Sequence, residues 1–355
     1  MLAIVLLVTS SSALADDEAR VFFGPTTADN QQGVYAGLLE FINSAQIEIS
    51  GSIHEIDMIT IADALAKKAR EGVRVQLVVE AKWYSQPKSE AARQTLESAG
   101  VKVIPDTKAS GLMHNKFWVV DGKRVWTGST NLTSTCLFYN PNNAIWIEQP
   151  KIAANFTTEF EEQKSGRFGK RESGIPNTPY PIVVLPTITI MTYFSPEDDA
   201  LTNLISEINS ASQRIDIMCF VFSSEDVSKA LIKAHQRGIK VRVLLDDTFR
   251  SEAATARWRY VPSKELLGAG IQVIWDNARS KLHHKVIIID TKTVVTGSMN
   301  LSANGANNND ENTLIIKSPR IASAFEVQFE KLWIQAGHPA ADDDEPETGD
   351  LDDSQ

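Results

Sequence analysis

The chain is poor in the residues that usually bind metals or cross-link small folds. It has two cysteines and six histidines in 355 residues, and no cluster of His, Cys and carboxylate residues has metal-ligand spacing. We therefore expect no required metal and no other cofactor. A disulfide between Cys136 and Cys219 is conceivable in an oxidising compartment. Because Cys219 lies in the apolar run 215–222, buried thiols are the favoured interpretation.

Long apolar runs are also missing, since no stretch after the N-terminal leader is long enough to span a bilayer. The leader itself has an apolar run, 2–8, a Ser-rich stretch, and the small-x-small pattern Ala13-Leu14-Ala15. These features predict that residues 1–15 are a signal peptide and that the protein is exported, either secreted or periplasmic. Because no Lys or Arg precedes the apolar run, an uncleaved membrane tether is the alternative.

An excess of positive charge is absent as well. The formal net charge is −10, but eight acidic residues and no basic ones lie between positions 342 and 355, so the remainder carries −2. A near-neutral body gives no reason to exclude anionic substrates. Residues 341–355 read as a solvated, disordered acidic tail, with a regulatory or partner-binding role as the alternative.

What the sequence does contain is one polar motif that occurs twice. The first copy comprises His114, Lys116, Asp121, Ser129 and Asn131, and the second comprises His283, Lys285, Asp290, Ser298 and Asn300. Each residue of the second copy lies 169 positions after its partner, without insertion or deletion. A single HxKxxxxD pattern arises easily by chance. Two copies, each followed by GSxN at the same distance, indicate a duplicated catalytic half-site.

The surrounding sequence repeats too, which predicts two domains of similar architecture. Helical and apolar strand patterns alternate in the same order in residues 16–162 and 188–340, as expected for an α/β fold with mixed sheets. Each motif is predicted to lie on a β-hairpin, followed by a helix capped by Thr133 or Ser302. The segment 163–187 reads as a linker. Its basic cluster is either solvated or guides a phosphate-bearing substrate, and comprises Lys164, Arg167, Lys170 and Arg171.

The paired motif supplies the groups that cleave a phosphodiester without a metal. One histidine attacks phosphorus and forms a phosphohistidine, while the other protonates the leaving alcohol and then activates water. Lys116 and Lys285 are predicted to stabilise the non-bridging oxygens. The substrate-binding candidates are the polar side chains of the two GSxN segments, Ser129, Asn131, Ser298 and Asn300. For the two serines, the alternative is that they only shape a turn. Asp121 and Asp290 complete the catalytic candidates, although each is placed at a hairpin turn and alternatively fixes backbone geometry or pairs with a lysine.

The two motifs resemble the signature of the phospholipase D superfamily, and the resemblance covers nearly the whole chain after the leader. The second half, from Tyr193 to Trp333, resembles small bacterial endonucleases and mitochondrial cardiolipin hydrolases, which carry one motif per chain and dimerise. The resemblance implies two tandem α/β/α sandwich domains with mixed sheets and pseudo-twofold symmetry. It also implies an active site at the domain interface and a covalent phosphohistidine. Because both motifs lie in one chain here, we expect a monomer.

Glu311 matches the family position whose carboxylate orients a histidine, and its equivalent in the first half is Asn142. We expect Glu311 to contact His283 and to favour its protonated form, which makes His283 the acid and His114 the nucleophile. Alternatively, the carboxylate activates His283 as the nucleophile. His284 is expected on the opposite face of the strand without a catalytic role.

The substrate is less well defined than the reaction. Our first hypothesis is phospholipase D-type hydrolysis of phospholipid to phosphatidic acid, with peripheral membrane contact through the aromatic pairs Trp83-Tyr84 and Phe138-Tyr139. The alternative is a secreted, sequence-nonspecific nuclease that tracks nucleic acid with Arg250, Arg257, Arg259 and Arg279. A cardiolipin synthase-type transferase ranks third, because that class usually has membrane-spanning segments. A non-catalytic binding module is disfavoured because both histidines and both lysines are present.

Overall fold

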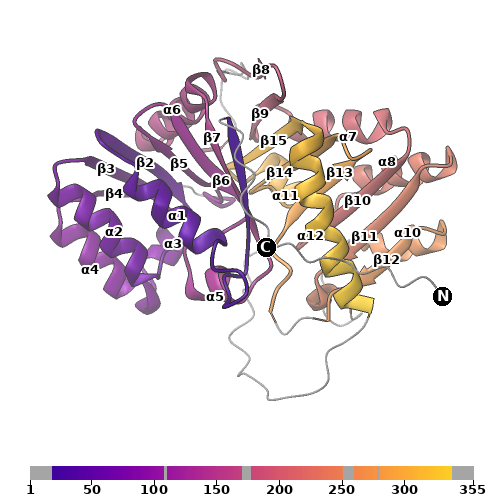
Figure 1. Ribbon diagram of the computed structural model, residues 1–355, viewed down its shortest axis with the longest axis horizontal. Helices are drawn as coiled ribbons and strands as arrows, with labels where there is room; N and C mark the ends of the chain where they lie inside the picture. The colour runs from indigo at the N-terminus through magenta and orange to yellow at the C-terminus, as the bar shows by residue number, and fades with distance from the viewer. Residues whose placement is uncertain (1–17, 108–109, 170–176, 251–259, 278–279, 338–355) are drawn as a thin grey trace.

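The computed structural model describes residues 18–107, 110–169, 177–250, 260–277 and 280–337. It contains two mixed β-sheets side by side, each flanked by helices (Figure 1). The predicted signal peptide and acidic tail lie outside the described residues, as do Lys170, Arg171, Arg257, Arg259 and Arg279. Within the described ranges, no helix has both the length and the apolar character needed to cross a membrane.

The first sheet has seven strands in the order β1-β7-β6-β5-β2-β3-β4. In chain order its strands are β1 (Ala19–Phe23), β2 (Glu48–Ile53), β3 (Arg74–Val79), β4 (Lys102–Pro105), β5 (Lys116–Val120), β6 (Arg124–Gly128) and β7 (Asn143–Glu148). The central parallel strand β3 ends in the buried apolar run Leu77, Val78 and Val79, as expected for a strand that is covered on both faces of the sheet.

The second sheet repeats this order and adds one strand, as β12-β11-β10-β13-β14-β15-β9-β8. Its strands are β8 (Ile182–Val184), β9 (Thr189–Ser195), β10 (Arg214–Cys219), β11 (Lys240–Leu245), β12 (Gln272–Trp275), β13 (Lys285–Ile289), β14 (Thr293–Gly297) and β15 (Glu311–Lys317). The extra strand β8 lies in the segment predicted as a linker and pairs with β9. The expected α/β fold with two tandem domains and mixed sheets is thus confirmed.

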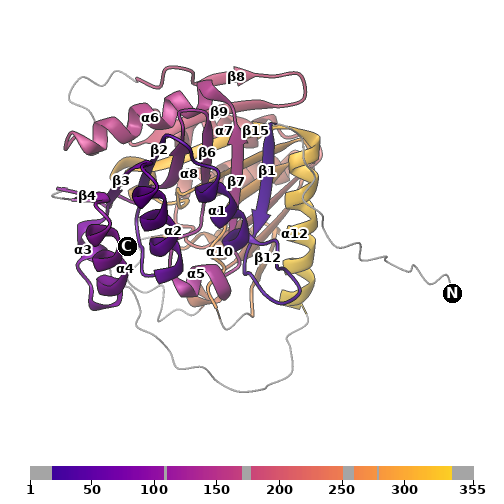
Figure 2. The same cartoon turned by 60° about the vertical axis from the view of Figure 1, so that its left-hand side comes forward.

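Helices cover both faces of each sheet (Figure 2). The outer helices are α1 (Val34–Asn43), α2 (Ile59–Arg70) and α4 (Glu90–Ser98) in the first half, and α7 (Ala200–Ser210), α8 (Glu225–Gln236) and α10 (Pro262–Gly268) in the second. The longer helices α6 (Pro150–Lys164) and α12 (Pro319–Gly337) share one apolar core with strands of both sheets. The largest buried side chains of that core are phenylalanines, among them Phe156 and Phe325. This central layer holds the two halves against each other.

Short helices α3 (Ala81–Tyr84), α5 (Ser134–Phe138) and α11 (Ala303–Asn307) connect these elements, with 3-10 turns at Pro87–Ser89 and Asp247–Phe249. The predicted caps of α5 and α11 are confirmed. The Thr133 side chain accepts the N–H of Cys136, and Ser302 accepts the N–H of Gly305.

The predicted catalytic role of Asp121 and Asp290 is not supported by their position. Both have φ of 53° at the turns of the β5–β6 and β13–β14 hairpins, a full strand of roughly 15 Å away from the histidines. Asp121 accepts the N–H groups of Ile47 and Glu48, and Asp290 does the same for Gln213 and Arg214. They fix the turns, and Asp121 pairs with Arg124 rather than with a lysine.

The two cysteines do not form a disulfide. Cys136 and Cys219 are both buried free thiols, as the apolar context of Cys219 predicts. Burial raises the pKa of each thiol, to about 11 for Cys219, so neither is ionised near neutral pH.

Candidate active site

The two motifs meet where the halves touch, and each is anchored to the opposite half. The His114 N–H donates to the carbonyl of Asp310, and the His283 N–H donates to the carbonyl of Pro141. Both histidines and both motif lysines are at most 7% exposed. The structure therefore brings His114, Lys116, His283 and Lys285 together, as the sequence predicts.

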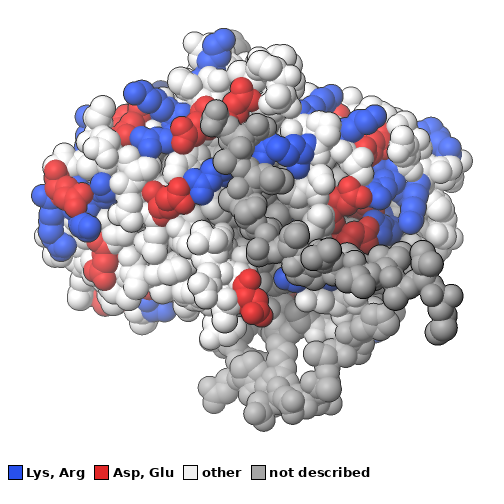
Figure 3. Space-filling view, viewed as in Figure 1, with Lys and Arg blue, Asp and Glu red and all other residues white. Residues whose placement is uncertain are grey.

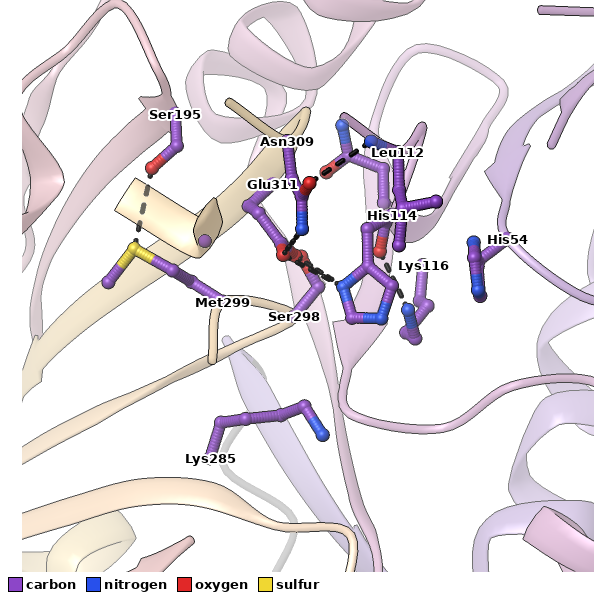
Figure 4. A network of polar contacts seen from close by, with 12 residues as sticks. His54, Leu112, His114, Lys116, Ser195, Lys285, Ser298, Met299, Asn309 and Glu311 are labelled. Carbon is purple, nitrogen blue, oxygen red and sulfur yellow. Dashed lines mark hydrogen bonds and ion pairs between the residues drawn. The ribbon is translucent and has the colours of Figure 1, made fainter. Parts of the chain in front are cut away.

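His114 is held by a carboxylate from the second half. Its Nδ1 lies 2.8 Å from both carboxylate oxygens of Glu311, the first residue of β15 (Figure 4). The prediction that Glu311 contacts His283 is wrong. The crossing of the two halves turns the start of each last strand toward the opposite motif, so the carboxylate reaches the histidine of the other half.

His283 has a neutral partner instead. Its Nδ1 lies 2.9 Å from the carbonyl oxygen of Ser129 and 3.1 Å from Oδ1 of Asn142. The Asn142 amide nitrogen donates to the carbonyls of Cys136 and Asn140, which leaves its oxygen as the acceptor. Because both histidines face acceptors at Nδ1, each carries its proton there and presents Nε2 as the reactive nitrogen.

The serines of the GSxN segments hold these partners in place. Ser298 Oγ donates to Glu311 over 2.6 Å, and Ser129 Oγ donates to Oδ1 of Asn142 over 3.1 Å. Asn309 adds a second donor to Glu311 at 3.3 Å. The serines thus support the groups that orient the histidines, which corresponds to the shaping role rather than to direct substrate contact.

The remaining candidates line the same site. Asn131 donates to Glu55 over 3.1 Å, and Asn300 is buried at the equivalent position of the second half. Lys116 Nζ donates to the carbonyl of His114, and Lys285 Nζ donates to that of His283. Each ammonium group is therefore fixed next to its own histidine.

Burial and mutual repulsion set the charges of the site. Burial, followed by the two lysines, lowers the pKa of His114 and of His283 well below the ordinary value. Burial also lowers the pKa of Lys116 to about 8 and that of Lys285 to about 7. It raises the pKa of Glu311 to about 7, while Lys116 opposes this shift. The histidines are neutral near pH 7 without substrate. An anion bound beside the lysines would stabilise their charged forms.

Two residues that the sequence does not reveal complete the immediate surroundings. His54 follows β2 and Phe220 follows β10, at equivalent places, since their N–H groups donate to the carbonyls of Asn115 and His284. The His54 ring lies 4.6 Å from that of His114, and the Phe220 ring lies 5.1 Å from that of His283. One sequence feature could have identified His54 and Phe220: each directly follows the strand that pairs with a motif strand.

A symmetric set of buried side chains joins the halves behind the histidines. Asn143 donates to Thr296 over 2.7 Å, and its oxygen lies 2.9 Å from Nδ1 of His284. In the other direction, Asn312 accepts from Thr127 over 2.7 Å and donates to Asn115 over 2.8 Å. His284 therefore belongs to this interdomain network, in keeping with its predicted lack of a catalytic role.

The surface candidates differ in exposure. Tyr84 is buried, Trp83 and Phe138 are half-buried, and Tyr139 is 65% exposed. Arg250 is exposed next to Trp275. In the part of the chain that the structure describes, one group of carboxylates has a spacing that could hold a metal ion, Glu159, Glu162 and Glu197, and it includes no motif residue.

Comparisons with known proteins agree with this geometry. The family model described as "Cardiolipin synthase, PLD-like domain" matches residues 38–164 and 204–333. Human mitochondrial cardiolipin hydrolase is 33% identical over 138 residues, 39% of this chain and 52% of that protein. A phospholipase D of Rickettsia conorii is 33% identical over 146 residues, 41% of this chain and 70% of that protein. The chain spans about 60% of the length of the cardiolipin hydrolases it matches.

A solved structure covers nearly all of the fold. Phosphatidylserine synthase from Haemophilus influenzae matches 91% of this chain and 87% of its own with a TM-score of 0.67 at 12% identity, which shows the shared architecture. With two motifs converging on one interdomain site and the family model matching both halves, this chain belongs to the phospholipase D superfamily.

Proposed function

We propose that the protein is a metal-independent phosphodiesterase that works through a phosphohistidine, with phospholipase D-type hydrolysis of phospholipid to phosphatidic acid as its reaction. The observation that carries this proposal is the pair of Nδ1-anchored histidines with two buried lysines beside them. The site has a nucleophile, a proton donor and positive charge for one phosphate group.

His114 is proposed as the nucleophile. Glu311 accepts its Nδ1 proton, which fixes the tautomer with a lone pair on Nε2 and stabilises the positive charge that forms on the ring as Nε2 bonds to phosphorus. The sequence also predicted His114 as the nucleophile, but on the ground that Glu311 contacts His283 and makes it the acid. Here the ground is the alternative one, that the carboxylate activates the histidine that it contacts.

His283 is proposed as the acid. Before substrate binds, burial and the two positive lysines lower the pKa of His283 and keep it neutral. A bound phosphodiester monoanion offsets the lysine charges and thereby raises the pKa of His283, so that Nε2 takes up a proton and gives it to the leaving oxygen. The P–O bond to the alcohol breaks as the P–N bond forms. His283, again neutral, then takes a proton from water, whose oxygen attacks phosphorus and releases His114.

Three observations support the choice of a lipid substrate. The similar proteins include a mitochondrial cardiolipin hydrolase and a phospholipase D. In the face seen in Figure 3, Lys and Arg are interspersed with Asp and Glu and form no continuous basic stripe for a nucleic-acid backbone. The exposed ring of Tyr139 is a candidate for peripheral membrane contact. Export through residues 1–15 and activity as a monomer are parts of the same proposal.

The test is a side-by-side assay of the full chain in EDTA. One set of reactions contains vesicles of phosphatidylcholine, phosphatidylethanolamine or cardiolipin, and the other contains single- and double-stranded DNA and RNA. Release of phosphatidic acid with intact nucleic acid supports the lipase. Degraded nucleic acid with intact lipid establishes the nuclease alternative, for which the exposed Arg250 is the first described residue to test.

A further inference from the structure

The two sides of the active site differ in charge, although the catalytic residues are symmetric. On the first side, the His54 ring lies against His114, and the Glu55 carboxylate accepts from Asn131 of the first motif. The equivalent positions beside His283 are occupied by Phe220 and Val221, because Ile56 and Phe222 make equivalent bridges to Leu132 and Leu301. At these two positions the first side therefore has an imidazole and a carboxylate, and the second side has a phenyl ring and an aliphatic side chain, while each side also has one buried carboxylate, Glu80 or Asp246.

The second side also carries a cation that the catalytic motif does not include. Lys281 is half-buried, and its Nζ lies 5.4 Å from the centroid of the Phe220 ring. The catalytic Lys285 lies 5.1 Å from the same centroid. Two ammonium groups thus lie near one ring that packs on His283. Because each Nζ is 5.1 or 5.4 Å from the ring centroid, the two Nζ atoms are at most about 10 Å apart. The equivalent of Lys281 in the first half is Leu112, and the cation nearest to that side is Lys88, whose Nζ lies 4.8 Å from the centroid of the Trp83 ring.

Lys281 is held in place by its backbone rather than by an acidic partner. Its N–H donates to Asn140, the Ser280 hydroxyl donates to the carbonyl of Tyr139, and the Leu282 N–H donates to Asp246. Among the described residues, Lys281 forms no ion pair within 4.0 Å. By contrast, Lys88 at the first side is paired with Glu55 over 3.0 Å. Of these two lysines, Lys88 is in an ion pair and Lys281 is not, although the charge of Lys281 opposes the rise that burial causes in the pKa of the nearby Asp246 carboxyl.

We infer that Lys281, above the Phe220 ring, binds a second phosphate carried by the leaving alcohol, and so fixes the direction in which a two-phosphate phospholipid enters the site. The inference rests on the proposed function, in which His283 protonates the leaving oxygen and the leaving alcohol therefore lies on the Phe220 side. Two phosphates joined through a glycerol bridge are separated by six bonds of about 1.5 Å, at most about 9 Å, which the spacing of Lys281 and Lys285 can match. In the reverse direction the second phosphate would face Glu55 and Lys88, an ion pair whose ammonium group is already bound to a carboxylate.

The test compares two lipids that differ at the leaving alcohol. Cardiolipin carries a second phosphate there, and phosphatidylglycerol carries glycerol alone. Each is presented in the same neutral detergent micelles, and kcat/KM is measured for the full chain and for Lys281→Ala, Lys281→Arg and Lys292→Ala. Lys292 is an exposed lysine at the β13–β14 turn and controls for the loss of one positive charge.

We expect Lys281→Ala to lower kcat/KM for cardiolipin about tenfold while changing that for phosphatidylglycerol less than about twofold, the size of one charge-assisted contact. Lys281→Arg should retain the preference, and Lys292→Ala should alter neither lipid. Because Lys281 is one of the charges that lower the pKa of His283, each comparison is made on the pH plateau of the variant.

Two results would overturn the inference in distinguishable ways. If Lys281→Ala lowers kcat/KM equally for both lipids, the subsite is wrong while lipid hydrolysis stands. If the unaltered protein cleaves neither lipid in these micelles, the proposed function fails and the subsite fails with it.

Discussion

The carboxylate of Glu311 lies 2.8 Å from Nδ1 of His114, although the two residues belong to different halves of the chain. The corresponding position for His283 is taken by the neutral amide of Asn142 at 3.1 Å. Two histidines that look equivalent in sequence are therefore in electrostatically different surroundings, which is the basis of the separate roles proposed for them.

Replacing the carboxylate should impair catalysis more than replacing the amide. We expect Glu311→Gln to lower kcat by about 10²-fold or more, because the charge that stabilises the His114 cation is lost. Asn142→Ala is the matched control and should lower kcat by about tenfold or less, since the Nδ1 of His283 keeps its contact with the carbonyl of Ser129. Steady-state kinetics at saturating lipid measure both, and equal losses would contradict separate roles.

Phosphoenzyme trapping identifies the nucleophile. His114→Ala should abolish labelled phosphoenzyme, because in the proposed mechanism Nε2 of His114 forms the bond to phosphorus. His283→Asn should still accumulate it, although more slowly, because only the acid is missing. Acid-quenched protein is analysed for acid-labile, base-stable label. Label that persists in the first variant and disappears in the second would reverse the assignment.

The lysines should limit activity on the alkaline side. The pKa of Lys285 is lowered to about 7 and that of Lys116 to about 8, so the free enzyme loses positive charge as the pH rises through these values. We expect kcat/KM to fall between about pH 7 and 9. In Lys285→Arg, whose guanidinium stays charged, the fall should move to higher pH even if the plateau is lower. If the alkaline fall in kcat/KM stays at the same pH in Lys285→Arg, the fall is caused by the titration of another group.

Asp121 should matter for stability and not for chemistry. Its carboxylate accepts backbone N–H groups of Ile47 and Glu48, and residues other than Gly, Asn and Asp fit its φ of 53° poorly. Asp121→Ala is expected to lower the free energy of unfolding by about 2 kcal/mol, measured by urea titration, with kcat/KM per folded molecule unchanged. Asp121→Asn, which keeps an acceptor, should lose less. A large loss of kcat/KM in a folded variant would restore a catalytic role.

Chelation should leave the reaction intact, because the proposed charges come from lysines and histidines. We expect the same rate in EDTA as in buffer alone. Activity that disappears in EDTA and returns with a divalent ion would contradict the mechanism and direct attention to Glu159, Glu162 and Glu197.

The sequence by itself determined the α/β class, the duplication and the residues of the half-sites. These follow from local rules: strand and helix periodicity, turn and cap chemistry, and two motifs at one fixed offset. The same rules explain why the thiol of Cys219 is buried and why a hairpin carries each motif. They also placed Asp121 and Asp290 at turns, from which their structural role follows.

Only the tertiary structure decided which residues meet across the two halves. Glu311 lies 28 positions after His283 and 197 after His114, yet it contacts His114, because the crossing of the halves brings the start of β15 to the opposite motif. The places of His54 and Phe220, and the Lys281 ammonium above that ring, depend on the same interface. Contacts between elements far apart in the chain do not produce a periodic pattern in the sequence. They are therefore determined only by how the two sheets pack against each other.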